Sequence, residues 1–325
     1  MQNFVEIYAP IEGRRLEKVK AFLKSMGLEF GTDAEFTAVI EDEAGNILAT
    51  GSLSSNVLKY IAVSDSIKGD GACASLVSEL VTKAYNMGRK HLFLYTKPKN
   101  REMFSSLGFY EVVSTESVLM MENKKHGLDE FLESIVAPKS GKTGAVVANC
   151  NPFTKGHLYL IEEAASRCDI LHLFIVSEDR SYFKSEVRYN LAKEAVSHLP
   201  NVYVHRSENY LVSHATFPTY FIKEKASVNK VQADLDLMLF ATRIAPALNI
   251  TTRFVGTEPF CEVTRFYNER MKAILPENGI EVVELERKDG ISASRVREAI
   301  MEKDFEAVHE LVPESVYEYI IKNNN

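Results

Sequence analysis

The sequence of 325 residues predicts a mixed α/β protein with two domains. Two regions carry β-branched, apolar segments that alternate with helix-period patterns, and residues 123–144 between them have a different character. This stretch holds one short amphipathic turn and ends in a run rich in Pro, Gly and Ser. We therefore expect a boundary near Ala137, with one domain over residues 1–137 and the other over residues 138–325.

Composition and charge narrow the classes of function. Apolar residues make up 46% and charged residues 26%, as in ordinary water-soluble globular proteins. The formal net charge is −7, whereas proteins that grip a nucleic-acid backbone are basic, so nucleic acid is not an expected partner. No apolar run reaches the ~18 residues that span a bilayer, and the N-terminus lacks a signal-peptide pattern. We therefore expect a cytoplasmic protein without a membrane partner.

The four cysteines are scattered along the chain and form no CxxC pair, so neither a disulfide scaffold nor a zinc knuckle is indicated. We expect them to be small buried side chains, since free Cys is among the most buried residue types. They are Cys73, Cys150, Cys168 and Cys261.

The first region begins with three segments that predict an antiparallel meander, over Phe36–Glu41, Ile47–Leu53 and Val57–Val63. A turn with Gly69 and Gly71 then opens a helix. Such a turn can bring backbone N–H groups close to a pyrophosphate, and the helix dipole adds to the attraction for anions. Ordinary structural turns share this composition, so the local pattern leaves both interpretations open.

A strand over His91–Thr96 and a short helix from Asn100 to Leu107 follow, and Gly108-Phe109 leads into another strand. This order resembles the GNAT N-acetyltransferase fold over about residues 30–122. The turn of that family cradles the pyrophosphate of coenzyme A. The resemblance implies that a CoA-derived arm binds at four residues, Gly69, Gly71, Ala72 and Asn100. Phe104 stands where many members carry a Tyr acid, and a phenyl ring cannot protonate a thiolate, so we expect binding more than acetyl transfer.

The second region opens with an apolar strand over residues 145–150, then residues 151–157 of sequence NPFTKGH, a helix and a second strand over Ile170–Val176. This is a βαβ unit whose motif lies at the carboxyl end of a strand, where α/β sheets bind ligands. His157 is expected in the first helical turn, and Gly156 leaves room for close approach. A lone His at such a place is more often a surface residue or a cap.

A second motif favours a functional role for His157. After a strand over Ile280–Leu285, residues 290–297 of sequence GISASRVR open another helix. TKGH and ISASRVR together resemble the HxGH and ISSTxxR signatures of the nucleotidyltransferase superfamily. The pair implies a Rossmann-like domain with a parallel sheet that binds ATP, so the expected fold is α/β and α+β, a GNAT-like domain followed by a nucleotidyltransferase domain. Thr154 replaces the first His of HxGH, and Asn151 stands where many members have Asp.

The superfamily resemblance also implies roles for residues. His157 and Thr154 would donate to phosphoryl oxygens, and Arg297 would act as a charged clamp. Ser292 and Ser294 would hold the β- and γ-phosphates, and Arg180 takes the place of a lysine at the incoming nucleophile. The expected catalytic residues are Thr154, His157, Arg180 and Arg297. The expected nucleotide-binding residues are Asn149, Asn151, Gly156, His157, Gly256, Glu258, Ser292, Ser294 and Arg297.

Two further expectations concern Glu258 and a bound metal ion. Glu258 lies in a loop after a strand over Arg253–Gly256, where it could contact nucleotide or metal, or could equally cap the next helix. Mg²⁺ is expected because it is the usual partner of transferred nucleotides, although no spacing of metal ligands announces a site.

The two halves together carry a closer resemblance. A GNAT-like domain joined to a nucleotidyltransferase with GTEPFC at residues 256–261 and ISASRVR at residues 291–297 is similar to the [citrate (pro-3S)-lyase] ligase family over essentially the whole chain. That family activates acetate with ATP, giving AMP and pyrophosphate. It then places the acetyl group on the thiol of the CoA-derived arm carried by the acyl carrier subunit of citrate lyase. The resemblance implies this activity and this partner here.

Two other interpretations stay open at this point. The chain could be a plain adenylyltransferase for a small phosphorylated molecule such as phosphopantetheine, with an N-terminal domain that only senses acyl-CoA; this predicts a dinucleotide product. It could also be a non-enzymatic adaptor that recognises a carrier protein, which predicts no nucleotide turnover. Neither the oligomeric state nor the acid beyond an acetate-like one follows from the sequence.

Overall fold

The computed structural model describes residues 4–177, 181–211, 220–221, 228–259, 261–286 and 291–324. Contacts divide the chain into two compact units. The first comprises Met1–Leu128 and Pro218–Val231, and the second comprises Asp129–Phe217 and Gln232–Asn325. The expected domain limits, 1–137 and 138–325, stay a prediction, and each unit is described by itself.

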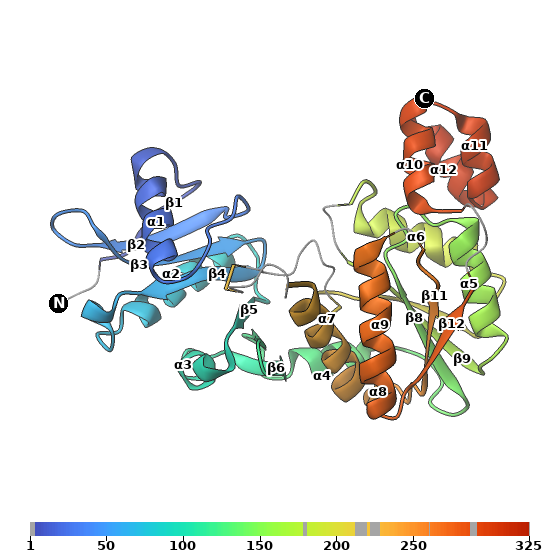
Figure 1. Cartoon of the computed structure of the whole chain (residues 1–325), viewed down its shortest axis with the longest axis horizontal. Coiled ribbons are helices and arrows are strands. Elements are labelled where there is room, and N and C mark those ends of the chain that lie inside the picture. Colours follow the sequence, from blue (N-terminus) through green and yellow to red (C-terminus); the bar gives the residue numbers. More distant parts are fainter. Residues whose placement is uncertain are drawn as a thin grey trace. The chain divides into compact units, whose positions relative to one another are not determined.

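The first unit is built on a seven-stranded sheet with the strand order β1-β2-β3-β4-β5-β7-β6 (Figure 1). The strands are β1 (Glu6–Tyr8), β2 (Phe36–Glu41), β3 (Ile47–Ser54), β4 (Val57–Val63), β5 (Phe93–Thr96), β6 (Tyr110–Ser114) and β7 (Leu119–Glu122). The expected antiparallel meander is confirmed, because β2, β3 and β4 pair antiparallel in sequence. β4 and β5 differ from the other neighbours, since they run parallel and pair at only two positions.

Helices and short 3₁₀ turns connect these strands. They are α1 (Gly13–Ser25), a 3₁₀ turn at Asp65–Ile67, α2 (Ala72–Asn86), a 3₁₀ turn at Pro98–Asn100 and α3 (Arg101–Ser106). The predicted helix after the glycine turn is α2, and its buried residues Leu76, Leu80 and Ala84 recur at spacings of four. They join a core cluster with strand residues such as Leu53 and Leu94. The apolar period thus buries one face of α2 in the core of the first unit.

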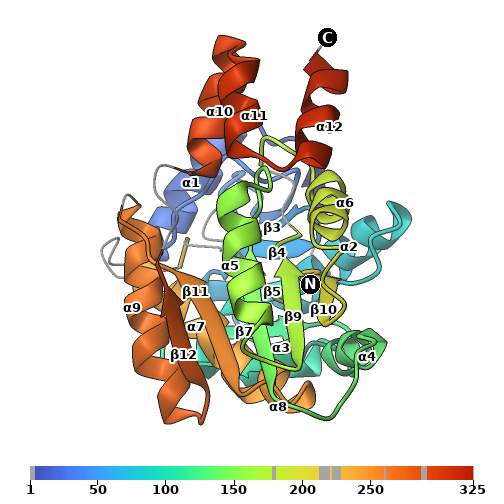
Figure 2. The same ribbon diagram turned by 90° about the vertical axis from the view of Figure 1, so that its right-hand side faces the viewer.

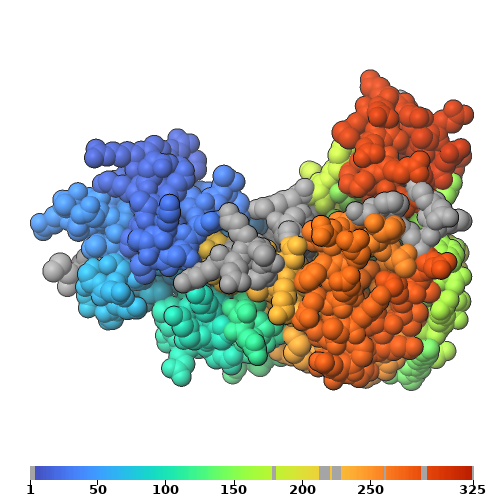
Figure 3. Space-filling model, in the orientation of Figure 1, coloured from blue at the N-terminus to red at the C-terminus, as the bar shows by residue number. Residues whose placement is uncertain are grey.

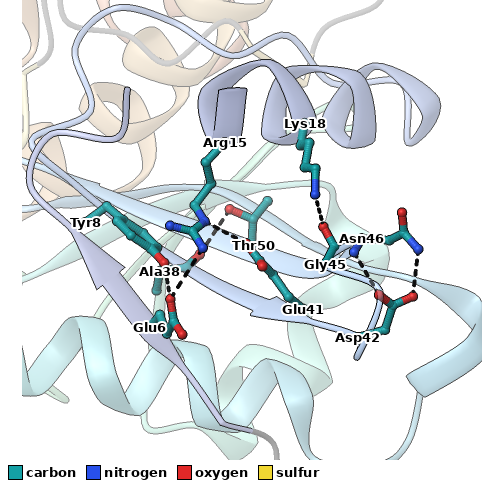
Figure 4. A network of polar contacts seen from close by, with 10 residues as sticks. All are labelled: Glu6, Tyr8, Arg15, Lys18, Ala38, Glu41, Asp42, Gly45, Asn46 and Thr50. Carbon is teal, nitrogen blue, oxygen red and sulfur yellow. Dashed lines mark hydrogen bonds and ion pairs between the residues drawn. The ribbon is translucent and has the colours of Figure 1, made fainter. Parts of the chain in front are cut away.

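Polar contacts fasten α1 and β1 to the β2–β3 hairpin (Figure 4). Arg15 donates from Nε to Glu41 Oε1 at 2.8 Å, and Lys18 donates to the carbonyl of Gly45. Asp42 accepts from both the backbone N–H and the side-chain amide of Asn46, which lowers the pKa of its carboxyl group. The network fixes the hairpin turn against α1 and lies outside the expected binding residues.

The second unit is built on a five-stranded sheet with the order β10-β9-β8-β11-β12, in which every neighbouring pair is parallel. The strands are β8 (Thr143–Ala148), β9 (Ile170–Ile175), β10 (Val202–Arg206), β11 (Thr252–Gly256) and β12 (Glu281–Leu285). Connections between parallel neighbours need crossovers, and helices supply them here. The expected fold class, mixed α/β with a parallel sheet in the second half, is confirmed.

Helices surround this sheet (Figure 2). They are α4 (Gly127–Ser134), where the two units divide, α5 (Lys155–Ala165), α6 (Ser185–Ala195), α7 (Val228–Leu239), a π-helix at Phe240–Ile244, α8 (Ala245–Ala247), α9 (Glu262–Glu277), α10 (Ala293–Glu302), α11 (Phe305–Leu311) and α12 (Glu314–Asn324). Figure 2 shows α5 in front of the parallel strands β8 and β9 and α10–α12 grouped beyond one end of the sheet. The same three helices form the red block in Figure 3. Among the helices of the described ranges, none combines the length and apolar character needed to cross a membrane.

Candidate functional site

The strand order of the second unit fixes where a ligand can bind. β8 comes first in the sequence of this sheet and lies at its centre, with β9 and β10 on one side and β11 and β12 on the other. The order therefore reverses between β8 and β11. In open α/β sheets, ligands bind at such a switch point, outside the carboxyl ends of the strands. The TKGH motif follows β8, and Gly256 and Glu258 end or follow β11, so both expected segments lie at this place.

His157 and Thr154 form a capping box at the start of α5. The Thr154 hydroxyl accepts the backbone N–H of His157 at 3.2 Å, and His157 Nδ1 accepts the backbone N–H of Thr154 at 3.0 Å. A backbone N–H can only donate, so Nδ1 carries the lone pair, and the proton of the neutral imidazole is on Nε2. The structure thus fixes the tautomer that offers Nε2–H as a donor.

Thr154 serves this box with its hydroxyl and its backbone N–H. Its side chain is buried, and the hydroxyl also lies 2.9 Å from His157 Nδ1. His157 itself is partly exposed. The sequence suggested that both residues donate to phosphoryl oxygens, whereas the geometry fits Thr154 for holding the imidazole and His157 for meeting a ligand.

The second motif meets the first. A Cβ atom at Gly156 would lie 3.3 Å from Ile291 Cγ2, so the glycine lets Ile291, two residues before α10, pack against the start of α5. Arg297 of α10 donates from Nη1 to the carbonyl of Asn151 at 2.5 Å. Segments far apart in the sequence therefore share one site, and the N-termini of two helices, each with partial positive charge, come together there.

The two serines of the second motif have different partners. Ser292 is the N-cap of α10, and its hydroxyl accepts the backbone N–H of Arg295 at 3.2 Å. The Ser294 hydroxyl accepts from Arg297 Nη2 at 3.0 Å. Both contacts hold the first turn of α10 and the guanidinium in one arrangement. A guanidinium has five N–H donors, so these two bonds leave Arg297 with donors for an anion.

Arg188 is a residue of this site that the sequence analysis missed. It is fully buried in α6 and donates from Nη1 to the carbonyl and Oδ1 of Asn149, each at 2.6 Å, and to the carbonyl of Val176 at 2.8 Å. It therefore ties the segments after β8 and β9 together. The available signal was its spacing: Arg188 precedes Leu191 by three residues, so a charge lies on the apolar face of α6.

The expected nucleotide residues Asn149 and Asn151 are both held by these contacts. Asn149 accepts from Arg188, and Asn151 Oδ1 accepts the backbone N–H of Phe183 at 3.0 Å. Their side-chain oxygens thus shape the loops around the site. Arg180, expected at the incoming nucleophile, lies outside the described residues.

The segment after β11 brings Glu258 to the start of α9. Its Oε1 accepts the backbone N–H of Cys261 at 3.1 Å, directly before α9, and the Gly256 carbonyl accepts from Asn268 Nδ2 at 3.0 Å. Glu258 therefore supports the start of α9 through this bond, and its expected contact with nucleotide or metal stays a prediction.

The expectation of buried cysteines is correct for Cys150 and wrong for Cys261, which is exposed. Cys73 and Cys168 are partly exposed. Cys261 sits at the N-cap of α9, where hydrogen bonds from Thr264 lower the pKa of its thiol. A helix N-terminus stabilises a thiolate, so this cysteine lies at a polar helix end instead of in a core.

The first unit places the expected arm-binding residues at the start of α2. Gly71 is the N-cap with φ of 79°, in the left-handed region that favours glycine, and no side chain caps the helix there. Ala72 begins α2, and Gly69 also has a positive φ. The first N–H groups of an α-helix have no intrahelical partner, so this turn offers donors to an anion. Asn100 donates to Thr96 Oγ1 at 2.7 Å and so holds the turn before α3.

The described side chains build no cluster of metal ligands. Within the described ranges, no three His, Cys, Asp or Glu side chains come together as metal ligands. Mg²⁺ bound with nucleotides takes most of its ligands from phosphates and water and only one or two from carboxylates. The described residues are thus compatible with an ion that arrives with ATP, and they build no separate metal centre.

The chain was compared with known proteins. The family model described as citrate lyase ligase C-terminal domain matches residues 143–320. A [Citrate [pro-3S]-lyase] ligase from Klebsiella pneumoniae is 42% identical over 319 residues, covering 95% of this chain and 93% of that protein.

Two solved structures are similar to parts of the chain. An acyl-CoA N-acyltransferase from Pseudomonas aeruginosa has 13% identity and a TM-score of 0.32, covering 37% of this chain and 99% of its own. Thermotoga maritima TmcAL bound with alpha-thio ATP has 15% identity and a TM-score of 0.35, covering 56% of this chain and 55% of its own. The identity to the Klebsiella protein spans nearly the full length of both chains, and the family model matches more than half of this one; the chain belongs to the [citrate [pro-3S]-lyase] ligase family.

Proposed function

We propose that this protein is an ATP-dependent ligase that activates acetate and acetylates the thiol of the CoA-derived arm on the acyl carrier subunit of citrate lyase. The observation that carries the proposal is the meeting of the two motifs at the switch point, where Arg297 of α10 bonds the carbonyl of Asn151 and Ile291 packs on Gly156. Two helix N-termini and one guanidinium around one point suit the triphosphate of ATP.

The first step is adenylylation. A carboxylate oxygen of acetate forms a bond to the α-phosphorus of ATP, the bond from that phosphorus to the bridging oxygen breaks, and pyrophosphate leaves with the electron pair. Charge on the phosphoryl oxygens is met by fixed donors, which need no reorganisation during the reaction. His157 Nε2–H is the donor that the capping box pre-orients, and Thr154 acts as a positioning residue.

The phosphates need partners on the opposite motif. The backbone N–H groups at the start of α10 and the Ser294 hydroxyl suit the β- and γ-phosphates, with Arg297 as the clamp. Ser292 acts as the N-cap that shapes this turn. Arg180 is proposed to hold the incoming carboxylate. Mg²⁺, when bound with ATP, neutralises charge on the phosphate oxygens.

The second step forms the thioester. The thiolate of the arm attacks the acetyl carbonyl carbon of acetyl-adenylate, the bond from that carbon to the phosphate oxygen breaks, and AMP leaves. We propose that the first unit binds the arm, with its phosphate at the N–H groups of Ala72 and the residues after it. The space beside Gly71 is open, since a Cβ atom there would meet no atom within 4 Å. One chain that binds all reactants raises their effective concentration.

The alternatives are less well supported. A plain adenylyltransferase needs only the second half, whereas the Klebsiella relative matches 95% of the chain. An adaptor without turnover needs no pre-oriented histidine or guanidinium, yet His157 and Arg297 both have fixed bonds at the switch point.

ATP–pyrophosphate exchange tests the proposal directly, because it reports adenylylation without the carrier. Acetate should support the exchange, longer acids should support it more slowly, and phosphopantetheine should not. Exchange with phosphopantetheine and none with acetate would favour the plain adenylyltransferase. Absence of exchange with any acid would favour the adaptor.

A further inference from the structure

Asn149 is an exposed residue directly after β8, the central strand of the parallel sheet. Arg188 Nη1 donates to the backbone carbonyl and to the side-chain Oδ1 of Asn149, each at 2.6 Å. Arg188 has no exposed surface, and its side chain also donates to the carbonyls of Val176 and Phe183. A buried guanidinium therefore holds an exposed carboxamide by its oxygen end.

This contact decides which way the carboxamide of Asn149 points. A guanidinium can only donate hydrogen bonds, so the atom that faces Arg188 must be the amide oxygen, and the NH₂ group points away from it. No described residue accepts a hydrogen bond from Asn149 Nδ2. The structure therefore offers two N–H donors in a fixed direction, at an exposed position just before the loop that carries the TKGH motif.

The place of Asn149 indicates which anionic oxygen these donors meet. Phosphoryl transfer puts the attacking and the leaving oxygen roughly in line, on opposite sides of the phosphorus. The proposed clamp for the leaving pyrophosphate is Arg297 of α10, so the acid enters on the side away from α10. The oxygen of Asn149 is anchored to α6, which follows β9, and β9 lies on the other side of β8 from β11.

The chemistry of a carboxamide also suits a carboxylate. The NH₂ group donates to one carboxylate oxygen in a charge-assisted hydrogen bond and leaves the other oxygen free to attack. A carboxamide is not an acid at neutral pH, so the bound carboxylate stays ionised and keeps its nucleophilic charge.

We infer that Asn149 binds the carboxylate of the incoming acid through its side-chain NH₂ group, and that Arg188 is the positioning residue that directs this group. Arg188 is fully buried and acts only through Asn149. The inference rests on the proposed function, in which acetate attacks ATP in the second unit. It assigns to the acid a residue that the sequence placed with the nucleotide.

Two substitutions of similar size separate the donors of Asn149 from its acceptor. Asn149→Asp keeps an oxygen for Arg188 and loses the donors, whereas Asn149→Leu loses both. Each should raise the KM for acetate in ATP–pyrophosphate exchange by about tenfold or more, because a hydrogen bond to a charged group is lost. Thermal melting should find Asn149→Asp at least as stable as the wild type, since its carboxylate pairs with the buried Arg188, and Asn149→Leu less stable.

Two further variants complete the set. Asn190→Asp adds the same charge at an exposed position of α6 and should keep the wild-type KM for acetate. Arg188→Lys keeps the charge without the forked geometry, so its KM for acetate should rise more than its KM for ATP. Calorimetry with ATP alone should give Asn149→Leu the affinity of the wild type.

The outcomes that overturn the inference are distinct. A wild-type KM for acetate in Asn149→Asp would leave Asn149 only as an acceptor for Arg188. A KM for ATP that rises as much as that for acetate, in Asn149→Leu or in folded Arg188→Lys, would return the pair to the nucleotide. Absence of acetate-dependent exchange in the wild type refutes the proposed function, whereas wild-type exchange with either of the first two outcomes refutes only the role of Asn149.

Discussion

The two units each start a helix from a turn with glycine, yet the two turns are built for different reasons. Gly71 before α2 has a φ of 79°, no atom would lie within 4 Å of an added Cβ, and no side chain caps the helix. Gly156 in the first turn of α5 has no such backbone requirement, but an added Cβ would lie 3.3 Å from Ile291 Cγ2. Gly71 allows the left-handed backbone conformation of its turn, and Gly156 leaves room for the distant segment at Ile291.

Because of this difference, the Gly71 turn and the Gly156 turn are suited to different tasks. The Gly71 turn is open and local, which suits a phosphate at the end of a long arm. The Gly156 turn is closed by the capping box of Thr154 and His157 and by the bond from Arg297 to the Asn151 carbonyl. A turn fixed by two segments far apart in the sequence can hold donors in the geometry of a transition state, whereas an open turn mainly binds.

The largest effect is expected from substitutions of His157 in the closed turn. In His157→Gln, the amide nitrogen can replace the Nε2–H donor but the Nδ1 acceptor is lost. In His157→Asn, the amide oxygen can replace Nδ1 but the Nε2–H donor is lost. We expect His157→Asn to lower turnover by about 10²–10³, since a donor matched to transition-state charge is worth about 2.7–4 kcal/mol, and His157→Gln to lose less. ATP–pyrophosphate exchange is the measurement.

Thermal melting of the same pair supplies the control. The cap should survive in His157→Asn and weaken in His157→Gln, so stability should rank in the opposite order to activity. His198→Asn, at an exposed histidine, should change neither quantity. If activity followed stability across the two His157 variants, the histidine would be a cap and no more.

Substitutions of Arg297 test the bond between the two motifs. Arg297→Met removes the contacts to Asn151 and Ser294 together with the clamp on the phosphates, and should lower kcat/KM for ATP by about 10- to 100-fold. Arg297→Lys keeps the charge but not the forked geometry and should recover only part of the loss. Steady-state kinetics at varied ATP gives the values, and an unchanged KM for ATP in Arg297→Met would argue against a phosphate clamp.

The two glycines themselves can be compared by substitution. Gly71→Ala should cost about 1–2 kcal/mol of stability because of its left-handed backbone, and Gly71→Asn should cost less, since Asn tolerates that region. Gly156→Ala should cost about 1 kcal/mol or more through crowding, and Ile291→Ala in the same chain should relieve part of that cost. Denaturant unfolding of the four variants tests the distinction, and equal costs for Gly71→Ala and Gly71→Asn would contradict it.

A pH dependence of stability is also expected, from two histidines of the parallel sheet. His172 of β9 and His205 of β10 lie 2.9 Å apart, Nδ1 to Nε2, and burial lowers their pKa values to about 4 and about 3. An unfolded histidine has a pKa near ~6.5, so below that pH the unfolded chain binds more protons than the folded one. The free energy of unfolding should therefore fall as the pH drops from about 6.5 to about 4.

Melting temperatures across that range should show the decline in the wild type and a shallower one in His205→Asn. The exposed His198→Asn variant serves as the control. A decline as steep in His205→Asn as in the wild type would assign the acid sensitivity to other groups.

Much of the fold follows from periodicity in the sequence. The meander β2–β4, helix α2 and the parallel arrangement around β8 and β9 carry clear two-residue or three-and-four-residue patterns, and the structure confirms each of them. The place of His157 in the first turn of a helix was also predicted, since a strand, a turn and an apolar-periodic segment follow in order. These features depend on neighbours within about one element of the chain.

Other features depend on groups that no local pattern connects. The place of Arg188 on the apolar face of α6 does not reveal its partners, the carbonyls of Asn149 and Val176, which follow two different strands. Cys261 looks like a core residue until the exposed N-terminus of α9 is placed around it. The bond from the Tyr220 hydroxyl to the Tyr95 carbonyl of β5 joins residues more than a hundred positions apart in the chain. The periodicity of a local segment does not indicate which distant groups its residues will bond.

The central claim is that adenylylation depends on the closed turn of the second unit and arm binding on the open turn of the first. The most direct measurement compares Gly71→Asp with Gly71→Asn in the full-length protein, since both residues tolerate a positive φ but only Asp repels a phosphate. The account predicts that both variants keep ATP–pyrophosphate exchange with acetate, while Gly71→Asp acetylates the carrier's arm at least tenfold more slowly than Gly71→Asn. Equal acetylation by the two variants, or loss of exchange in a folded Gly71→Asp, would contradict it.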